Sequence, residues 1–257
     1  MTLPDPRCEA DPRCEADRRT AAGRRRFLRS SLAGATALTA AAGLASCSPP
    51  GPLAVRGERQ RARPTTPEAA LGELEAGNRR WRTLHERHPD ETRSVRQALL
   101  VGQHPFVVVL GCVDSRVPPE LVFDQGLGDL LTVRSAGGVL DEAVLGSVTY
   151  GVVELGIPLV VVLGHQSCGA VAAAVHAEQE GTQLPGHMRY LGEQIRPAID
   201  RRLQGQARID AAVTANIRLV RSRLAAEPDL SSRMSAGTLA VVGARYELTS
   251  QRVHRIP

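Results

Sequence analysis

Two short segments of the chain each end in residues that can bind a metal ion. Residues 107–116 read VVVLGCVDSR, so an apolar run ends at Cys112. Residues 159–169 read LVVVLGHQSCG, so a second apolar run ends at His165 and Cys168. Thiolates and imidazole are ligands that zinc prefers in proteins. The residue types therefore predict that these three side chains bind one zinc ion per chain.

Each apolar run is typical of a short buried β-strand. A run of β-branched residues bounded by glycine fits a parallel strand that is covered on both faces. The carboxyl ends of parallel strands meet in one crevice, which is where open α/β sheets place their sites. Between the runs, apolar spacing from Asp141 up to Gly156 predicts a helix. A strand–helix–strand crossover would bring His165 next to Cys112.

An acid and a base follow the first candidate ligand. Arg116 can pair with Asp114, which would keep the carboxylate ionised and away from the metal. Asp114 would then accept a hydrogen bond from the reacting hydroxide. If the pair breaks, Asp114 becomes a fourth metal ligand. A purely structural salt bridge at the end of a strand is the alternative interpretation.

These residues resemble the β class of carbonic anhydrases. Residues 112–116 (CVDSR) resemble that family's C-x-D-S-R signature, and residues 165–169 (HQSCG) resemble its H-x-x-C-G signature. Residues 123–126 (FDQG) and 134–138 (RSAGG) are also similar to family segments. The resemblance covers about residues 66–253, which is nearly all of the globular part.

The resemblance implies a zinc-dependent lyase, a carbonate dehydratase. It would interconvert CO2 with bicarbonate and a proton by metal-bound hydroxide, with Asp114 and Arg116 as catalytic residues. Gln103 matches a family position that hydrogen-bonds substrate. Gly137 permits close approach of the backbone beside the metal pocket, and we assign it to substrate binding. The family forms dimers and tetramers, which implies a homodimer or homotetramer here.

Other functions fit parts of the same pattern. Relatives hydrolyse CS2 or COS at the same kind of site. A non-catalytic protein could use zinc only to hold its fold, although structural zinc usually takes four fixed ligands. Cys112 and Cys168 could also be ordinary core residues or form a disulfide with each other.

We expect an α/β domain at residues 66–257, with a central, mostly parallel sheet of four to five strands flanked by helices. Thr66 and the following Pro67 predict the start of a helix, an N-terminal arm that in the family wraps a partner subunit. Trp81 on this helix is interpreted as core packing. Further strands are expected at residues 131–133 and 239–242, a short helix at 93–101, and a sheet edge at 245–253, as the sequence pattern indicates.

The net charge of +5 does not predict a nucleic-acid partner. Residues 1–46 hold 8 arginines and 5 acidic residues, a net charge of +3, which leaves +2 for the rest of the chain. No clustered basic face with interleaved aromatic residues is evident. Five cysteines in 257 residues are also too few for a disulfide framework.

Residues 1–46 have the pattern of a disordered leader followed by an export signal. The hexapeptide DPRCEA occurs twice, at residues 5–10 and 11–16, and predicts disorder or a mis-assigned start codon. Residues 24–29 (RRRFLR) resemble a twin-arginine signal, and the Ala-rich stretch after them is too short for a membrane span. Residues 44–47 (LASC) resemble a lipobox, which makes Cys47 a candidate lipid anchor. We therefore expect a periplasmic or otherwise extracytoplasmic protein, with a linker at residues 47–65.

Overall fold

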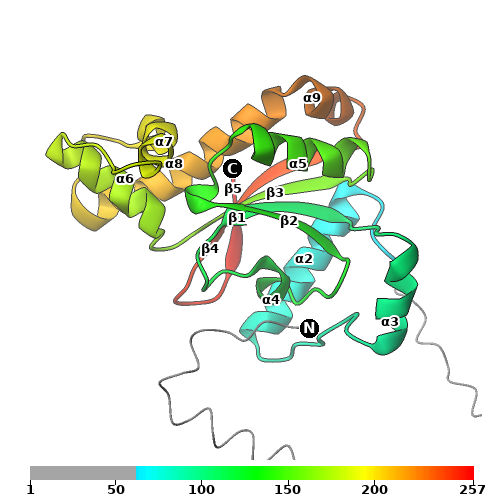
Figure 1. The fold of residues 1–257 in the computed structure, drawn as a ribbon. Coiled ribbons are helices and arrows are strands. Elements are labelled where there is room, and N and C mark those ends of the chain that lie inside the picture. The colour runs from blue at the N-terminus through cyan, green and yellow to red at the C-terminus, as the bar shows by residue number, and fades with distance from the viewer. Residues whose placement is uncertain (1–61) are drawn as a thin grey trace, which may run out of the picture. The chain divides into compact units, whose positions relative to one another are not determined.

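A five-stranded sheet forms the centre of the part of the chain that the structure, a computed structural model, describes, residues 62–257 (Figure 1). The strand order is β2-β1-β3-β4-β5, with β5 antiparallel to β4 and the other neighbours parallel. Helices flank the sheet, so the predicted fold class is confirmed. The leader, the export signal and Cys47 lie outside the described residues, as does most of the predicted linker.

The first four strands lie close to the segments that the sequence predicted. The strands are β1 Val107–Cys112, β2 Leu130–Ser135, β3 Leu159–His165, β4 Ala240–Tyr246 and β5 Val253–Ile256. The helices are α2 Pro67–Arg82, α3 Arg93–Ala98, α4 Pro119–Val122, α5 Glu142–Val153, α6 Gly169–Glu180, α7 Met188–Ile195, α8 Gly205–Ala226 and α9 Pro228–Ser235. Short 3-10 helices are η2 Leu99–Val101, η3 Ala136–Gly138 and η4 Arg196–Ala198. The helix expected at residues 93–101 is therefore α3 continued by η2.

The register of the sheet brings the C-terminal ends of β1 and β3 to the same end of the sheet. Strand β1 pairs in parallel with both β2 and β3, and its last residue, Cys112, lies opposite Ser135 of β2. His165, the last residue of β3, lies opposite Tyr246 of β4. Helix α5 connects β2 to β3 and begins after its N-cap Asp141, whose side chain accepts a hydrogen bond from Val144 N.

Both faces of the sheet are covered, which explains the unbroken apolar runs. Alternate residues of β1 face opposite layers: Val108 and Leu110 pack with α5, α6 and α8, and Val107 and Val109 pack with α2 and α4. The two layers lie on opposite sides of the sheet in Figure 1. Every residue of β1 is buried. Each Å² of apolar surface that is buried contributes about 25 cal/mol to stability, so these two layers are the main source of stability.

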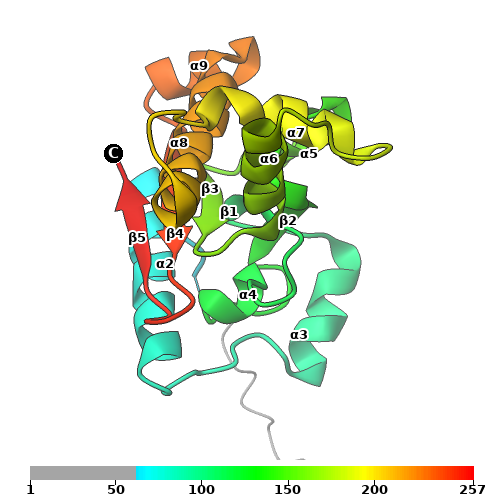
Figure 2. The same cartoon turned by 90° about the vertical axis from the view of Figure 1, so that its left-hand side faces the viewer.

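Helix α2, the predicted arm, packs on the sheet of its own chain. Figure 2 shows it beside β4 and β5. Its Asn78 donates to Val122 O at 3.1 Å and to Gln251 O at 3.0 Å, and accepts from Val253 N at 2.9 Å. Trp81 packs against the same core layer, as expected. Contact of this helix with a partner chain stays a prediction.

The chain does add an edge strand near the expected residues 245–253, but that strand, β5, begins only at Val253. Strand β4 ends at Tyr246, and the chain reverses before β5 pairs antiparallel with β4. Gln251, with a φ of 57°, adopts a left-handed conformation within this reversal. Among residues 62–257, no helix combines the length and the apolar composition that crossing a bilayer requires.

Candidate metal centre

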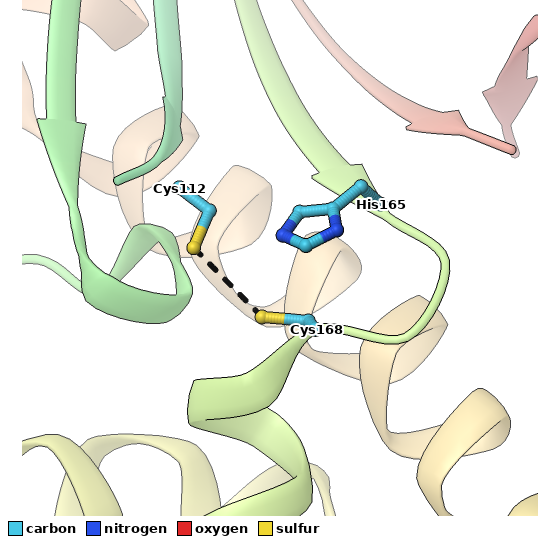
Figure 3. A group of neighbouring side chains, drawn as sticks. All are labelled: Cys112, His165 and Cys168. Atoms are coloured by element: carbon cyan, nitrogen blue, oxygen red, sulfur yellow. Dashed lines mark hydrogen bonds between the residues drawn. The ribbon is translucent and has the colours of Figure 1, made fainter. Parts of the chain in front are cut away.

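The structure brings Cys112, His165 and Cys168 together at the carboxyl end of the sheet (Figure 3). One ligand atom from each residue lies within 4.8 Å of the other two. All three side chains are buried, and the two sulfur atoms are 3.9 Å apart, hydrogen-bonded but not joined in a disulfide. We refer to these three residues as the ligand group.

Two of the three ligands come from one short loop between β3 and α6. His165 ends β3 and Cys168 is the N-cap of α6. Between them Ser167 has a φ of 55°, a left-handed conformation that turns the chain sharply. Gln166 fastens the loop to the end of β4, because its N–H donates to Tyr246 O at 2.8 Å.

The imidazole of His165 has a nitrogen that is available as a metal ligand. Its Nδ1 lies 2.9 Å from the carbonyl oxygen of Gln166, which assigns the proton to Nδ1 and leaves the lone pair on Nε2. Nε2 is buried and has no hydrogen-bond partner among the described residues. A buried polar atom without a partner is costly, and a metal ion would supply one. The ligand group therefore fits zinc.

The two cysteine sulfurs form a hydrogen bond with each other. The S–H of Cys168 hydrogen-bonds the sulfur of Cys112 and lowers the pKa of Cys112 to about 4. The same bond, together with burial, raises the pKa of Cys168. The pair therefore puts the first negative charge on Cys112. Zinc binding requires both thiolates and so releases the remaining proton.

Asp114 stands beside the ligand group and is held by Arg116. The Arg116 guanidinium donates to the two carboxylate oxygens at 2.9 Å and 2.7 Å, and its Nη2 also donates to Ser167 O at 3.3 Å. The hydrogen bond from Arg116 lowers the pKa of Asp114 to about 2, so the carboxylate is ionised. Its Oδ2 lies 3.9 Å from His165 Nε2. Direct metal ligation by Asp114 stays a prediction.

Arg134 of β2 is a site residue to which the sequence assigned no role. Its Nε donates to Cys112 O at 2.9 Å, and its Nη2 donates to Asp114 O at 2.6 Å. These two bonds fix the backbone that carries the first ligand and the carboxylate. Only the strand pairing of β2 with β1 brings this side chain to the site, and the pairing is not visible in the sequence.

Gly137 lies next to the ligand group, as expected of a residue that permits close approach. It has a φ of 70°, and its N–H donates to Cys112 Sγ at 3.3 Å. That φ strains any residue with a side chain, and a Cβ here would also lie 2.9 Å from Ile195 Cδ1, so the position favours glycine. Because the N–H is already used by the sulfur, contact of Gly137 with substrate stays a prediction.

Gln103 lies near the N-terminal end of β1, whereas Cys112 lies at its C-terminal end. It is exposed and precedes β1, whose 6 residues span roughly 20 Å at about 3.3 Å each. Its neighbour His104 and Gly128, which precedes β2, both accept hydrogen bonds from Arg63. Gln103 therefore does not reach the ligand group of its own chain in this structure.

Comparison with known proteins identifies the family. Residues 107–253 match the family model described as carbonic anhydrase. Carbonic anhydrase 2 of Mycobacterium tuberculosis is 43% identical over 190 residues, which cover 73% of this chain and 92% of that protein. The solved β-carbonic anhydrase CcaA is 26% identical with a TM-score of 0.59, covering 72% of this chain and 86% of that one. The chain therefore belongs to the carbonic anhydrase family, in its β class.

A more distant structure supports the fold alone. One of two tetrameric β-carbonic anhydrases from Sordaria macrospora superposes with a TM-score of 0.58 at 18% identity, covering 74% of this chain and 94% of that one. The family, the fold and the enzyme class, a carbonate dehydratase, are confirmed as predicted.

Proposed function

We propose that this protein catalyses the reversible hydration of CO2 to bicarbonate and a proton, with one zinc ion held by Cys112, His165 and Cys168. The observation that carries the proposal is the buried, unpartnered Nε2 of His165, which shares a space less than 5 Å across with two sulfur atoms. Two thiolates and a neutral imidazole are a zinc donor set that leaves a fourth position open.

Zinc, when bound, supplies a Lewis acid that lowers the pKa of water and so yields a nucleophile at neutral pH. Two thiolates would neutralise the charge of the ion and weaken it as a Lewis acid, so other side chains must help to activate the water. Asp114 is ionised and free to accept a hydrogen bond from the attacking water, which would orient the oxygen toward CO2. Arg116 holds that carboxylate by donating to both of its oxygens. Loss of this pairing would let Asp114 close the fourth position.

We further propose a homodimer or homotetramer. The Sordaria relative is tetrameric. Gln103 lies roughly 20 Å from the ligand group of its own chain, so a substrate contact would have to come from Gln103 of a second copy. The oligomer is measurable by light scattering of the purified protein. A monomer with full activity would remove Gln103 from the site.

The leader supports a proposal of export from the cytoplasm, with Cys47 as a candidate lipid anchor. Its support is the arginine cluster at residues 24–29 followed by a short Ala-rich stretch. Replacing Arg25 and Arg26 by lysine should retain the protein in the cytoplasm on cell fractionation. Export of this double variant at the normal level would contradict the proposal.

A stopped-flow CO2 hydration assay with metal analysis tests the activity. We expect turnover to follow zinc content up to one ion per chain, to disappear on chelation and to return with zinc. Zinc at full occupancy without turnover would favour a structural role. Release of hydrogen sulfide from COS or CS2, with no CO2 hydration, would favour the hydrolase alternative.

A further inference from the structure

A buried asparagine on α8 connects to the ligand group. Asn216 is 5% exposed and lies within the apolar stripe of α8, which packs on the sheet. A buried amide is costly unless it is hydrogen-bonded. Its Nδ2 donates to the carbonyl oxygen of Gly137 at 2.8 Å. The amide is therefore retained in the core with a specific partner.

The partner of Asn216 is the residue that hydrogen-bonds a metal ligand. The carbonyl of Gly137 accepts from Asn216, and the N–H of Gly137 donates to Cys112 Sγ at 3.3 Å. Gly137 adopts a left-handed conformation that orients both groups. Rotation of Gly137 would move its N–H away from the sulfur, and the bond from Asn216 opposes that rotation.

Helix α8 also borders the ligand group directly. Asn216 and Gly137 line a small cavity of about 20 Å³ together with Cys112, His165 and Cys168. The Oδ1 of Asn216 is buried and without a hydrogen-bond partner among the described residues. Of the two polar atoms of the Asn216 amide, only Nδ2 is paired within residues 62–257, through its bond to Gly137 O. The unpaired Oδ1 is destabilising, so this bond is the stabilising contact of the amide.

We propose that Asn216 is a positioning residue for the metal: through Gly137 it holds the sulfur of Cys112 where zinc can bind it together with His165 and Cys168. The inference rests on the zinc centre proposed above. His165 and Cys168 share one short loop, whereas Cys112 is the ligand that a separate part of the chain must bring into place. Hydrogen bonds that orient a metal ligand typically contribute 10- to 100-fold to metal affinity.

The test compares zinc affinity in two variants of matched chemistry, Asn216→Leu and Asn78→Leu. Asn78 is also 5% exposed and makes three hydrogen bonds, to Val122, Gln251 and Val253, so its loss disturbs the fold at least as much. Competition with a chelator of known affinity should show about 10- to 100-fold weaker zinc binding in N216L. We expect N78L to bind zinc within about threefold of wild type while unfolding at a lower denaturant concentration.

Cobalt substitution supplies a second readout. The sulfur-to-cobalt absorption of the Co²⁺-loaded protein should weaken or shift in N216L and stay unchanged in N78L. If N216L does not fold, Asn216→Ala with Asn78→Ala as its control serves the same purpose, because alanine is well tolerated in a helix.

Equal zinc affinity of N216L and wild type would overturn the inference, and so would an equal loss in N78L. Zinc binding is measured independently of turnover. Failure of wild type to hydrate CO2 therefore contradicts the proposed function and not the role of Asn216.

Discussion

The two halves of the ligand group are built differently. His165 and Cys168 lie on one loop whose turn is set by Ser167, so their relative placement is largely local. Cys112 stands alone at the end of β1 and depends on support from other elements. Its backbone is held by Arg134, and its sulfur by the N–H of Gly137. Substitutions far from Cys112 in the sequence should therefore affect the metal through this half of the centre.

Removing a ligand should have the largest effect and should not distinguish the halves. Cys112→Ala and Cys168→Ala each delete one thiolate. If a zinc site with a binding free energy of about 10–16 kcal/mol loses roughly a quarter of it, the affinity falls on the order of 100-fold or more, within a range of about 60- to 900-fold. Zinc analysis after dialysis should find little metal, and CO2 hydration should fall with it. Full zinc occupancy in either variant would exclude that cysteine as a ligand.

Asp114→Ala should separate chemistry from metal binding within the Cys112 half. The variant keeps all three members of the ligand group but loses the acceptor that orients the attacking water. We expect turnover to fall about 10²- to 10⁴-fold with zinc content unchanged. Stopped-flow assays with metal analysis of the same sample provide the measurement. A variant that retains most of its activity would show that Asp114 has no catalytic role.

Arg116→Gln should have an intermediate effect, because Arg116 connects the segment after Cys112 to the His165–Cys168 loop. It bonds Asp114 and also Ser167 O. Loss of a charge-assisted bond of about 1.5–3 kcal/mol predicts roughly a tenfold or greater decrease in turnover. The pKa of Asp114, about 2 here, would rise toward its ordinary value of 3.8, and the carboxylate would stay ionised at neutral pH. Raising the pH from 7 to 9 should therefore not restore wild-type turnover.

Gln166→Ala should have the smallest effect, because the loop that it supports is set locally. Its Oε1 accepts bonds from Thr249 N at 3.1 Å and Thr249 Oγ1 at 3.2 Å. We expect about 1 kcal/mol less stability in denaturant unfolding and less than about threefold change in zinc affinity. A tenfold loss of affinity would mean that the His165–Cys168 half also relies on distant support.

The sequence was sufficient to predict that Cys112, His165 and Cys168 lie together, because they stand at the ends of two apolar runs. The β-branched residues of β1 and β3 predicted buried strands, and the structure confirms both. Asn216 and Arg134 were missed, because their roles depend on the rotation of α8 and the pairing of β2 with β1. A polar residue inside the apolar stripe of α8 was the one available signal for Asn216.

Two features of the fold could not be predicted from the apolar periodicity of the sequence. The helix from Pro67 was predicted, but its apolar spacing could not say whether it covers its own sheet or that of another chain. The reversal before β5 was missed because Gln251 adopts a left-handed conformation, which is uncommon for residues other than glycine. Asn78 of α2 stabilises this turn, because it accepts a hydrogen bond from Val253 N and donates one to Gln251 O.

The short distance between the two sulfur atoms sets an order of events for the protein. Cys112 and Cys168 are 3.9 Å apart, and a disulfide bond measures about 2.05 Å. A metal-free chain that met an oxidant would need only a small movement to join them, and would lose two of its three ligands at once. Filling the centre with metal while the surroundings are still reducing would protect both thiolates. A secretion route that accepts chains already folded would allow this sequence of steps.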